Sequence, residues 1–261
     1  MRIRSCILLA LSLGWTHRIS AESLYSVTDL GTLGGCCTEA HGINNVGQVT
    51  GSSSTLDGLL THAFLYRNGQ MMDLNDSFGR ALVVGNSVIN PGHVVGVDRF
   101  LLINPFAFSY YSGQVISLGA LGGGRGAHSA ANSVNDSGQV TGFTSTGGAS
   151  TLGGIVHAFL YSNGQMQDLR TLSGTSSSGE SINNVEQVTG QSFICSGASH
   201  AFLSVNGDML HLNTLIDPAL GVMLADAPGI NDRGQIAANG FYLAPRTVMH
   251  ISSPQFRNQR P

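Results

Sequence analysis

Short apolar runs alternate along this chain with turn residues, and the alternation repeats at a nearly constant interval. Each repeat begins with a run ending in Ile or Val, followed by Asn, a turn and a second run in which Gln or His precedes Val or Ile. The five copies occupy residues 42–51, 87–96, 133–142, 181–190 and 229–238. Aligned on Ile43, Ile89, Val134, Ile182 and Ile230, they are 46, 45, 48 and 48 residues apart. A period in this range indicates a fold built from stacked copies of one unit.

Two further motifs complete a unit of four short strands. The second motif is His-Ala-Phe-Leu-Tyr or a variant of it, at residues 62–66, 106–110, 157–161, 200–204 and, in degenerate form, 240–244. The third follows an Asn-Gly or Ser-Gly pair, at residues 70–74, 114–118, 165–169 and 208–212. Asn-Gly favours the tight turns that join paired antiparallel strands, and no stretch shows a sustained helical period. Four-strand units of about 45 residues predict the blades of a β-propeller.

The two ends of the array predict a closed ring. The fifth unit ends after its third strand, near Tyr242, and residues 25–30 match the missing fourth strand. An N-terminal strand that completes the last sheet removes the open edge of the array. We therefore predict an all-β fold, a five-bladed β-propeller of four-stranded antiparallel blades over residues 22–245. Its units are expected at about residues 40–74, 86–118, 130–169, 179–212 and 227–243 plus 25–30, followed by a flexible tail at 246–261.

The first 21 residues have the pattern of a secretory signal peptide. Arg2 and Arg4 precede an apolar run at residues 6–15, and Ala21 offers a small residue for cleavage before Glu22. The alternative is an N-terminal membrane anchor, but a helix needs about 20 apolar residues to span a bilayer. The pattern predicts a secreted product, extracellular or periplasmic, with no membrane span once the leader is removed.

Composition narrows the range of partners. Only 10% of the 261 residues are charged, the formal net charge is -3, and the 12 basic residues are all arginines. This excludes a basic nucleic-acid surface, because phosphate contacts require clustered cations. The 42% of apolar residues distinguishes the chain from disordered sequences. Phosphate loops, nucleophile elbows and metalloprotease helices are missing from the sequence, so we predict no cofactor and no metal, and we expect a monomer.

The second motif and its flanking residues resemble a known family. His-Ala-Phe triplets begin at residues 62, 157 and 200, and they accompany Ile-Asn, Gly-Gln-Val and the Asp-Leu-Gly-Thr-Leu-Gly-Gly segment at 29–35. Together these elements resemble the HAF-repeat proteins, a group of bacterial extracellular repeat proteins, over about residues 25–243. The resemblance implies an exported bacterial repeat protein and brings no established biochemical activity. Phe106 and Gly240 depart from the histidine position, which argues against one shared task for all the histidines.

The predicted strand order places all the long, variable connections on one face of the disc. Loops held by a rigid scaffold commonly carry binding. We therefore expect a secreted non-catalytic binding or structural module that uses this face to bind a glycan or a protein. On the innermost strands, His41, Asn132 and Glu180 occupy matching positions and are the candidate binding residues, with Ser87 and Pro228 at the other two positions.

A secreted glycan-active hydrolase of the five-bladed propeller type is the alternative. Glycan hydrolysis requires two carboxylates about 5 to 10 Å apart. The candidate catalytic acids are Glu180, Asp57 and Asp98, and Glu39, Asp217 and Asp226 also lie near the long loops. Of these six, Glu180 alone falls on a predicted innermost strand. This alternative therefore needs Glu180 to meet an acid from a loop.

His62, His157 and His200 are interpreted as structural residues of the repeat. Strands lie about 4.8 Å apart within a sheet, so third strands of different blades diverge outward from the centre. Their histidines cannot share one metal ion, and each is expected to make a repeated hydrogen bond.

Three cysteines remain after removal of the leader, namely Cys36, Cys37 and Cys195. An exported protein permits a disulfide between Cys195 and one of the adjacent pair. Three thiols without a disulfide are the open alternative.

Overall fold

The computed structural model describes residues 7–11, 25–75, 82–100, 104–123, 126–147 and 154–243. This part of the chain is all-β apart from two 3-10 turns, η1 (Leu212–Thr214) and η2 (Pro218–Leu220), which confirms the predicted fold class. The strands are β1 (Ile7–Leu11), β2 (Tyr25–Asp29), β3 (Gly34–Ile43), β4 (Val49–Thr55), β5 (Thr61–Arg67), β6 (Gln70–Asp73), β7 (Leu82–Ile89), β8 (His93–Phe100), β9 (Asn104–Tyr111), β10 (Gln114–Gly119), β11 (Ser129–Val134), β12 (Val140–Ser145), β13 (Val156–Ser162), β14 (Gln165–Arg170), β15 (Ser177–Ile182), β16 (Val188–Phe193), β17 (Ser199–Val205), β18 (Asp208–His211), β19 (Val222–Ile230) and β20 (Ile236–Tyr242).

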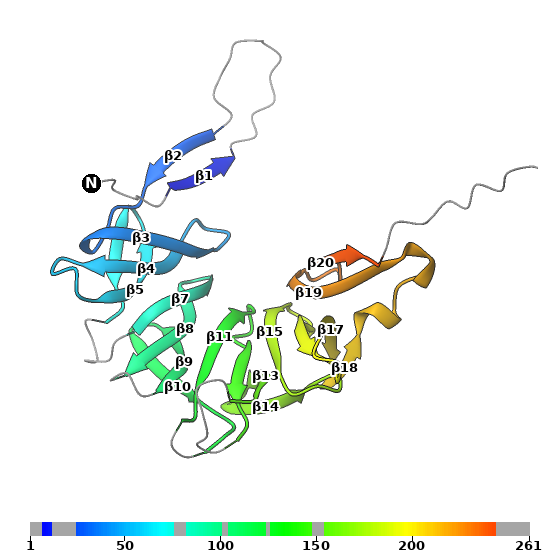
Figure 1. Cartoon of the computed structure of the whole chain (residues 1–261). Coiled ribbons are helices and arrows are strands. Elements are labelled where there is room, and N and C mark those ends of the chain that lie inside the picture. Colours follow the sequence, from blue (N-terminus) through cyan, green and yellow to red (C-terminus); the bar gives the residue numbers. More distant parts are fainter. Residues whose placement is uncertain are drawn as a thin grey trace, which may run out of the picture.

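Four sheets each contain four antiparallel strands in sequence order, and we call them blades one to four. They consist of β3–β6, β7–β10, β11–β14 and β15–β18, and the two-stranded sheet β19–β20 begins blade five. Successive blades lie side by side around an open arc, with blade one and blade five at its two ends (Figure 1). The predicted four-stranded unit is confirmed for four of the five copies.

The Asn-Gly pairs form the tight turns between third and fourth strands. Asn68 and Gly69 have φ values of 50° and 78°, and Asn163 and Gly164 have 53° and 79°. Positive φ at both central positions gives the twist that paired strands need, and Asn and Gly adopt it at low cost. These turns set the register of the outer two strands in blades one and three.

In blades one to four a glycine follows the Val-Thr or Val-Val pair of the second strand, because no side chain fits there. A Cβ built on Gly51, Gly96 or Gly142 would lie 1.9 Å from a carbonyl oxygen of the first strand, and one on Gly190 would lie 2.0 Å away. The close approach occurs beside a bulge in each first strand. Even alanine would therefore force the two strands apart.

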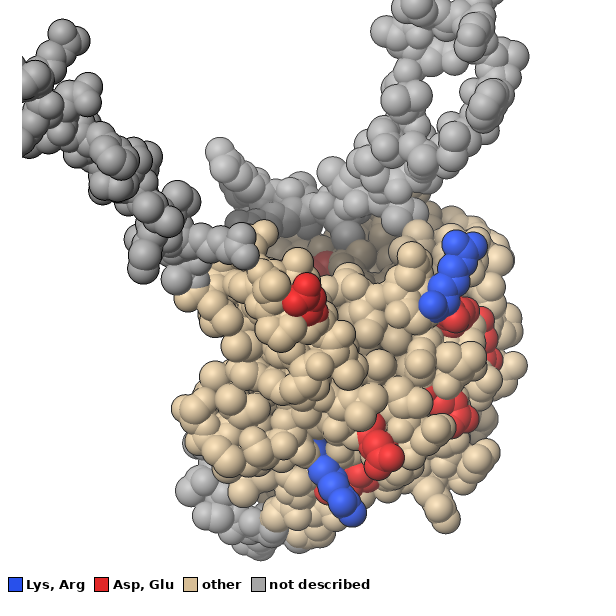
Figure 2. Space-filling model, turned by 90° about the vertical axis from the view of Figure 1, so that its right-hand side faces the viewer, with Lys and Arg blue, Asp and Glu red and all other residues tan. Residues whose placement is uncertain are grey.

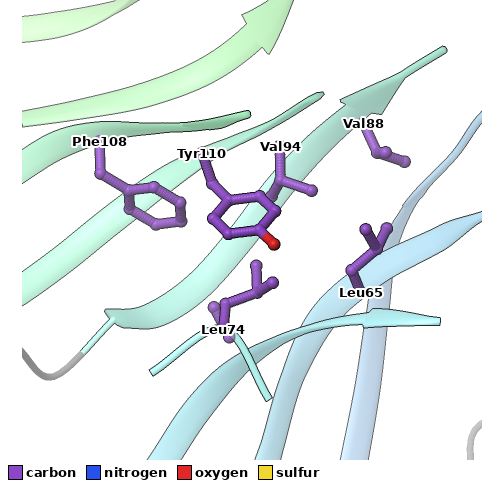
Figure 3. Close-up of a cluster of buried hydrophobic side chains, with 7 residues drawn as sticks. Leu65, Leu74, Val88, Val94, Phe108 and Tyr110 are labelled. Carbon is purple, nitrogen blue, oxygen red and sulfur yellow. The ribbon is translucent and has the colours of Figure 1, made fainter. Parts of the chain in front are cut away.

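Each fourth strand leads to a leucine that packs into the next blade. Leu74 shares one buried cluster with Val94 and Phe108 of blade two, and Leu65 of blade one reaches the same cluster (Figure 3). The arrangement recurs along the arc, with Leu118 beside Val140 and Phe159, and Leu169 beside Val188 and Phe202. Burying one such ring or leucine contributes about 1.5–3 kcal/mol. The phenylalanines of the second motif are thus the core of the blade boundaries.

Blade five is shorter than the sequence predicted. β20 runs without interruption to Tyr242, which pairs with Val222 of β19, so residues 240–242 continue the second strand. The Asn-Gly pair at 239–240 lies beside a bulge of the β19–β20 hairpin and makes no turn. The prediction of a separate third strand in this copy was wrong for that reason.

The predicted closing strand pairs elsewhere in this structure. β2 is antiparallel to β1, with Tyr25 opposite Leu11 and Asp29 opposite Ile7, so residues of the predicted leader take up one of its edges. The arc is consequently open between blade five and blade one (Figure 1). The cleavage point after Ala21 and the predicted tail at 246–261 lie outside the described residues. In the part of the chain that the structure describes, no helix has the length and apolar character to cross a membrane.

Candidate binding face and blade boundaries

The connections between second and third strands and between successive blades emerge on one side of the arc, which we call the loop face. Its described parts include residues 56–60, 154–155, 171–176, 194–198 and 212–221. The strands run further toward this face than the sequence predicted, since β4 ends at Thr55 and β8 at Phe100. The hydrogen-bonded ladders continue to those residues, so the loops are shorter than expected.

The loop face carries large, exposed apolar side chains. Leu56 and Leu59 in the connection from β4 to β5 are 84% and 83% exposed, and Leu60 beside them is 52% exposed. Ile155, Leu215 and Leu220 on other parts of this face are also more than half exposed. Charge is sparse on the surface drawn in Figure 2, where a few acidic and basic side chains, some of them next to each other, lie among uncharged residues. Three leucines in one short loop favour contact with another apolar surface, because water solvates them poorly.

The candidate binding residues occupy a bulge in the first strand of each blade. His41, Asn132 and Glu180 are the residues that the pairing with the second strand skips in blades one, three and four. In blade two the skipped residue is Asn86, which corrects the expectation of Ser87. The structure thus places these side chains in four different blades, each at the edge of a blade boundary.

The correction in blade two comes from the register of its first hairpin. Val88 pairs with Val94 as Ile43 pairs with Val49, so Val88 is the structural equivalent of Ile43. The ten-residue copies at 42–51 and 87–96 are equally long and match without a gap in this register. Alignment on Ile89 displaced the expected position by one residue.

Two of the bulged residues join neighbouring blades. Asn86 Nδ2 donates to the carbonyl oxygen of Ala131 at 2.7 Å, and Asn132 Nδ2 donates to that of Gly179 at 2.8 Å. Both amides are therefore used in holding blades together. His41 lies at the exposed end of the arc, with its Nε2 3.9 Å from a carboxylate oxygen of the neighbouring glutamate.

Glu180 occupies the same bulge in front of blade five, but an ionised carboxylate has no hydrogen to donate. Partial burial, followed by the charge of Asp226 on β19, raises the pKa of Glu180 above its ordinary value. Asp226 accepts a hydrogen bond from Asn239 Nδ2 at 2.7 Å within the same hairpin. The boundary therefore disfavours the ionised form of Glu180 compared with a glutamate in water.

The other two candidate acids are engaged in their own blades. Asp57 accepts hydrogen bonds from a threonine hydroxyl and a backbone amide of its own loop, in that order of effect, and they lower its pKa. Asp98 is buried in β8 and accepts the amide of Phe106 at 3.0 Å. Of the candidate acids, Asp226 is the one whose charge acts on Glu180. Among the described residues, no three His, Cys, Asp or Glu side chains are grouped so that they could hold a metal ion.

The histidines of the second motif bind within their own blades. His62 Nδ1 lies 2.7 Å from Asp73 Oδ2, and His157 Nδ1 lies 2.9 Å from Asp168 Oδ1. Each pair connects the third strand to the fourth, at the point where the chain leaves for the next blade. The histidine therefore fixes the position of an aspartate that also accepts a backbone amide two residues further on, where the fourth strand ends.

Blade four has a histidine where blades one and three have this aspartate. His200 Nδ1 and His211 Nε2 are 2.6 Å apart, and the two rings are stacked with their centroids 4.7 Å apart. Burial, and then the proximity of His200, lowers the pKa of His211. Because one of these two nitrogens must accept the hydrogen bond, the two rings together carry at most one positive charge.

Asparagines at the tight turns join blades three, four and five, a role that the sequence did not disclose. Asn135 Nδ2 donates to the carbonyl oxygen of Asn183 at 2.9 Å, and Asn183 Nδ2 donates to that of Asn231 at 3.0 Å. Their side-chain oxygens accept amides of their own turns, from Gln139 at 3.0 Å and Gln187 at 2.9 Å. The available signal was the recurrence of asparagine at a 48-residue spacing, which a turn alone does not require.

The three cysteines lie in two separate places. Cys36 and Cys37 are adjacent and exposed on β3, with their Sγ atoms 2.7 Å apart. Cys195 is exposed in the connection from β16 to β17, and its thiol donates to the carbonyl oxygen of Ser173 at 3.0 Å. The structure contains no disulfide between them. A bridge from Cys195 to blade one remains a prediction.

One solved structure that is similar to this chain is the crystal structure of TolB from Acinetobacter baumannii. The match has a TM-score of 0.44 and 12% sequence identity, and it covers 67% of this chain and 43% of that chain. The aligned part thus spans less than half of the TolB chain. No protein-family model and no curated protein matches the sequence.

Proposed function

We propose that the protein is an exported, non-catalytic binding or structural module of the HAF-repeat type, a five-bladed propeller that binds its partner through the loop face. The observation that carries the proposal is the exposed leucine cluster of residues 56–60 on a rigid repeat scaffold. Exported character is inferred from the leader pattern of residues 1–21.

Ring closure is supported by the packing of the residue that follows β2. Leu30 is 4% exposed and lies in a buried cluster with Val49 and Phe64 of blade one. Leu74 has the same relation to Val94 and Phe108 of blade two. In the other boundaries this leucine lies at the end of the fourth strand of the preceding blade or directly after it, and in a ring the blade that precedes blade one is blade five.

The connector after Leu30 is also attached as the other connectors are. The amide of Leu33 donates to Ser53 Oγ at 2.9 Å. Equivalent bonds run from Leu121 to Thr144 Oγ1 at 3.0 Å and from Leu172 to Ser192 Oγ at 2.9 Å. Residues 30–35 are therefore bound to blade one as an inter-blade connector, while β2 pairs with the leader. Removal of the leader frees β2 to complete blade five.

The two ends of the arc expose surfaces that inner blades bury. β3 is mostly exposed, whereas β11 and β15, at the same place in blades three and four, are mostly buried. On blade five a hollow of about 470 Å³ is lined by residues 229–231 and 235–237, beside the turn of Asn231. Closure would cover both surfaces and would extend the asparagine series from Asn231 to the turn of Asn44.

The leucines of the loop face favour a protein as the partner over a glycan. Glycan sites depend on hydroxyl and amide hydrogen bonds, whereas Leu56, Leu59 and Leu60 offer apolar surface with few polar groups. Such residues gain free energy when a partner removes them from water, by roughly 25 cal/mol per Å² of apolar surface.

The test compares a loop-face variant with a variant of the opposite face. Leu56→Ser, Leu59→Ser and Leu60→Ser are combined in one protein, and Val46→Ser with Val185→Ser, two exposed turn positions, form the matched control. Each protein is cross-linked to purified extracytoplasmic proteins of the producing cell and, separately, applied to a glycan array. We expect a specific protein adduct that the loop-face variant loses and the control keeps. Adducts that are equal in all three proteins would contradict the loop-face proposal.

The hydrolase alternative rests on one observation, the raised pKa of Glu180 beside the charge of Asp226. A protonated carboxyl near a second carboxylate is the arrangement of a glycosidase acid and base. A screen of glycan hydrolysis with Glu180→Gln as control separates the two proposals. Turnover by the wild type that is lost in the variant would establish the alternative and overturn our preference.

A further inference from the structure

The two adjacent cysteines of blade one lie in a large bulge of β3. The strand pairs with β4 at Gly34 and again at Thr38, so that residues 35–37 lie opposite the single residue Ser54. A Cβ built on Gly35 would lie 2.5 Å from the Cβ of Ser54, so only glycine allows the backbone to approach β4 here. The bulge thus adds backbone at the two cysteines while its start is held against β4.

Inside this bulge the two sulfur atoms face each other. Cys36 Sγ and Cys37 Sγ are 2.7 Å apart, compared with about 2.05 Å in a disulfide bond. Ser54 Oγ donates to the carbonyl oxygen of Cys37 at 3.1 Å and holds that residue to β4. Hydrogen bonding from the thiol of Cys37 lowers the pKa of Cys36, against a weaker opposing effect of burial. Because the thiolate is the nucleophile in disulfide exchange, this lowered pKa favours Cys36 as the attacking thiol.

We propose that Cys36 and Cys37 are a redox pair that closes to a vicinal disulfide by exchange with a small-molecule disulfide such as oxidised glutathione, and that Cys195 takes no part in it. The Cys36 thiolate attacks one sulfur of glutathione disulfide, forming a mixed disulfide and releasing one glutathione thiolate. The Cys37 thiolate then attacks the sulfur of Cys36 and releases the second. Two electrons pass to glutathione disulfide, and the two thiol protons end on the two glutathione molecules.

The geometry makes this disulfide easy to reopen. Adjacent Cα atoms across a trans peptide are 3.80 Å apart, below the range of about 4.4–6.8 Å that ordinary disulfides span. Strained and exposed disulfides are the more readily reduced ones. The pair therefore acts as a reversible redox site beside the connector that follows β2. The disulfide joins Cys36 to Cys37, and the bridge to Cys195 that the sequence allowed does not form.

The experiment uses the full chain with Cys6→Ser, so that three cysteines remain. Since the chain has no lysine, trypsin cleaves only at arginine, and the peptide 19–67 holds Cys36 and Cys37 while the peptide 171–233 holds Cys195. After equilibration with oxidised glutathione, mass spectrometry should find the peptide 19–67 lighter by two hydrogen atoms. Cys195→Ser should give the same result, and reduced glutathione should restore the original mass.

Labelling of the reduced pair tests the assigned roles. A short pulse of iodoacetamide should alkylate Cys36 several-fold faster than Cys37, because the Cys37 thiol lowers the pKa of Cys36 and the thiolate is the nucleophile. A cross-link between the peptides 19–67 and 171–233, or retention of both thiols in the peptide 19–67 under oxidising conditions, would overturn the proposal. Equal labelling of the two cysteines would overturn the assignment of Cys36 as the attacking thiol.

Discussion

Replacing Glu180 by glutamine tests the description of the blade boundaries most directly. Asn86 and Asn132, at the equivalent bulges of blades two and three, each donate an amide hydrogen to a carbonyl oxygen of the following blade. Glu180 faces blade five from the same position but is repelled by Asp226 when ionised. Glutamine keeps the size of the side chain, removes the charge and supplies the amide donor that the other blades use. We therefore expect Glu180→Gln to stabilise the protein at neutral pH.

The magnitude follows from the hydrogen bond and the sign follows from the pKa. One intramolecular hydrogen bond contributes about 0.5–1.5 kcal/mol net, and a domain of this size gains about 2–4 °C in Tm per kcal/mol. The pKa of Glu180 is raised above 4.5 in the folded state, so the wild type is favoured by protonation at low pH and loses that stability as pH rises through the raised pKa. The advantage of the glutamine variant should therefore be present at pH 7 and vanish near pH 4.

Thermal unfolding of both proteins between pH 4 and pH 8 measures this difference. Glu39→Gln is the matched control, because that carboxylate lies on β3 with its side chain 78% exposed and should change the free energy of unfolding by less than about 0.5 kcal/mol. A Glu180→Gln protein that is less stable than the wild type at pH 7, or that keeps the wild-type pH dependence, would refute the boundary role of Glu180.

Three further predictions concern ring closure, the asparagine series and the histidine pair. In a chain that starts at Glu22, amide hydrogens of β20 should exchange with solvent more slowly than in the full chain, because β2 can then pair with blade five. Deletion of residues 25–30 should abolish that protection. Equal exchange in all three proteins would contradict closure by β2. Asn183→Ala should lower the free energy of unfolding, measured by chemical denaturation, by about 2–3 kcal/mol, because it removes a buried side chain that bonds its own turn and blade five. Asn44→Ala, at the end of the arc, should lower it clearly less. His211 has a lowered pKa, so its contribution to stability is present above its unfolded pKa of about 6.5 and is lost as pH falls through the folded value. His211→Asp, which restores the partner found in blades one and three, should remove this acid sensitivity in pH-dependent melting curves, and an unchanged acid limb would argue against the pair as its source.

Much of the blade could be predicted because its determinants are local. Asn68 and Gly69 specify a turn through their own backbone preferences, and the apolar run around Phe64 specifies a short strand that is buried on both faces. The site was harder to predict because its side chains act across blade boundaries. Asn132 and Asn183 were visible in the sequence as an inner-strand position and a turn residue, but their acceptors lie 47 and 48 residues away in the next blade.

The amino-acid sequence by itself determined the repeat, the four-stranded unit and the all-β class, since these follow from short-range periodicity and turn chemistry repeated at nearly equal steps. Only the tertiary structure decided which residues meet. It showed Asn86 as the bulged residue of blade two, Asp226 as the acidic neighbour of Glu180, and Leu30 as a core residue of blade one. The physical reason is that these contacts depend on strand register and on the packing of one blade against the next. A change of register by one residue would alter both, because it moves every side chain of a strand to the other face of the sheet.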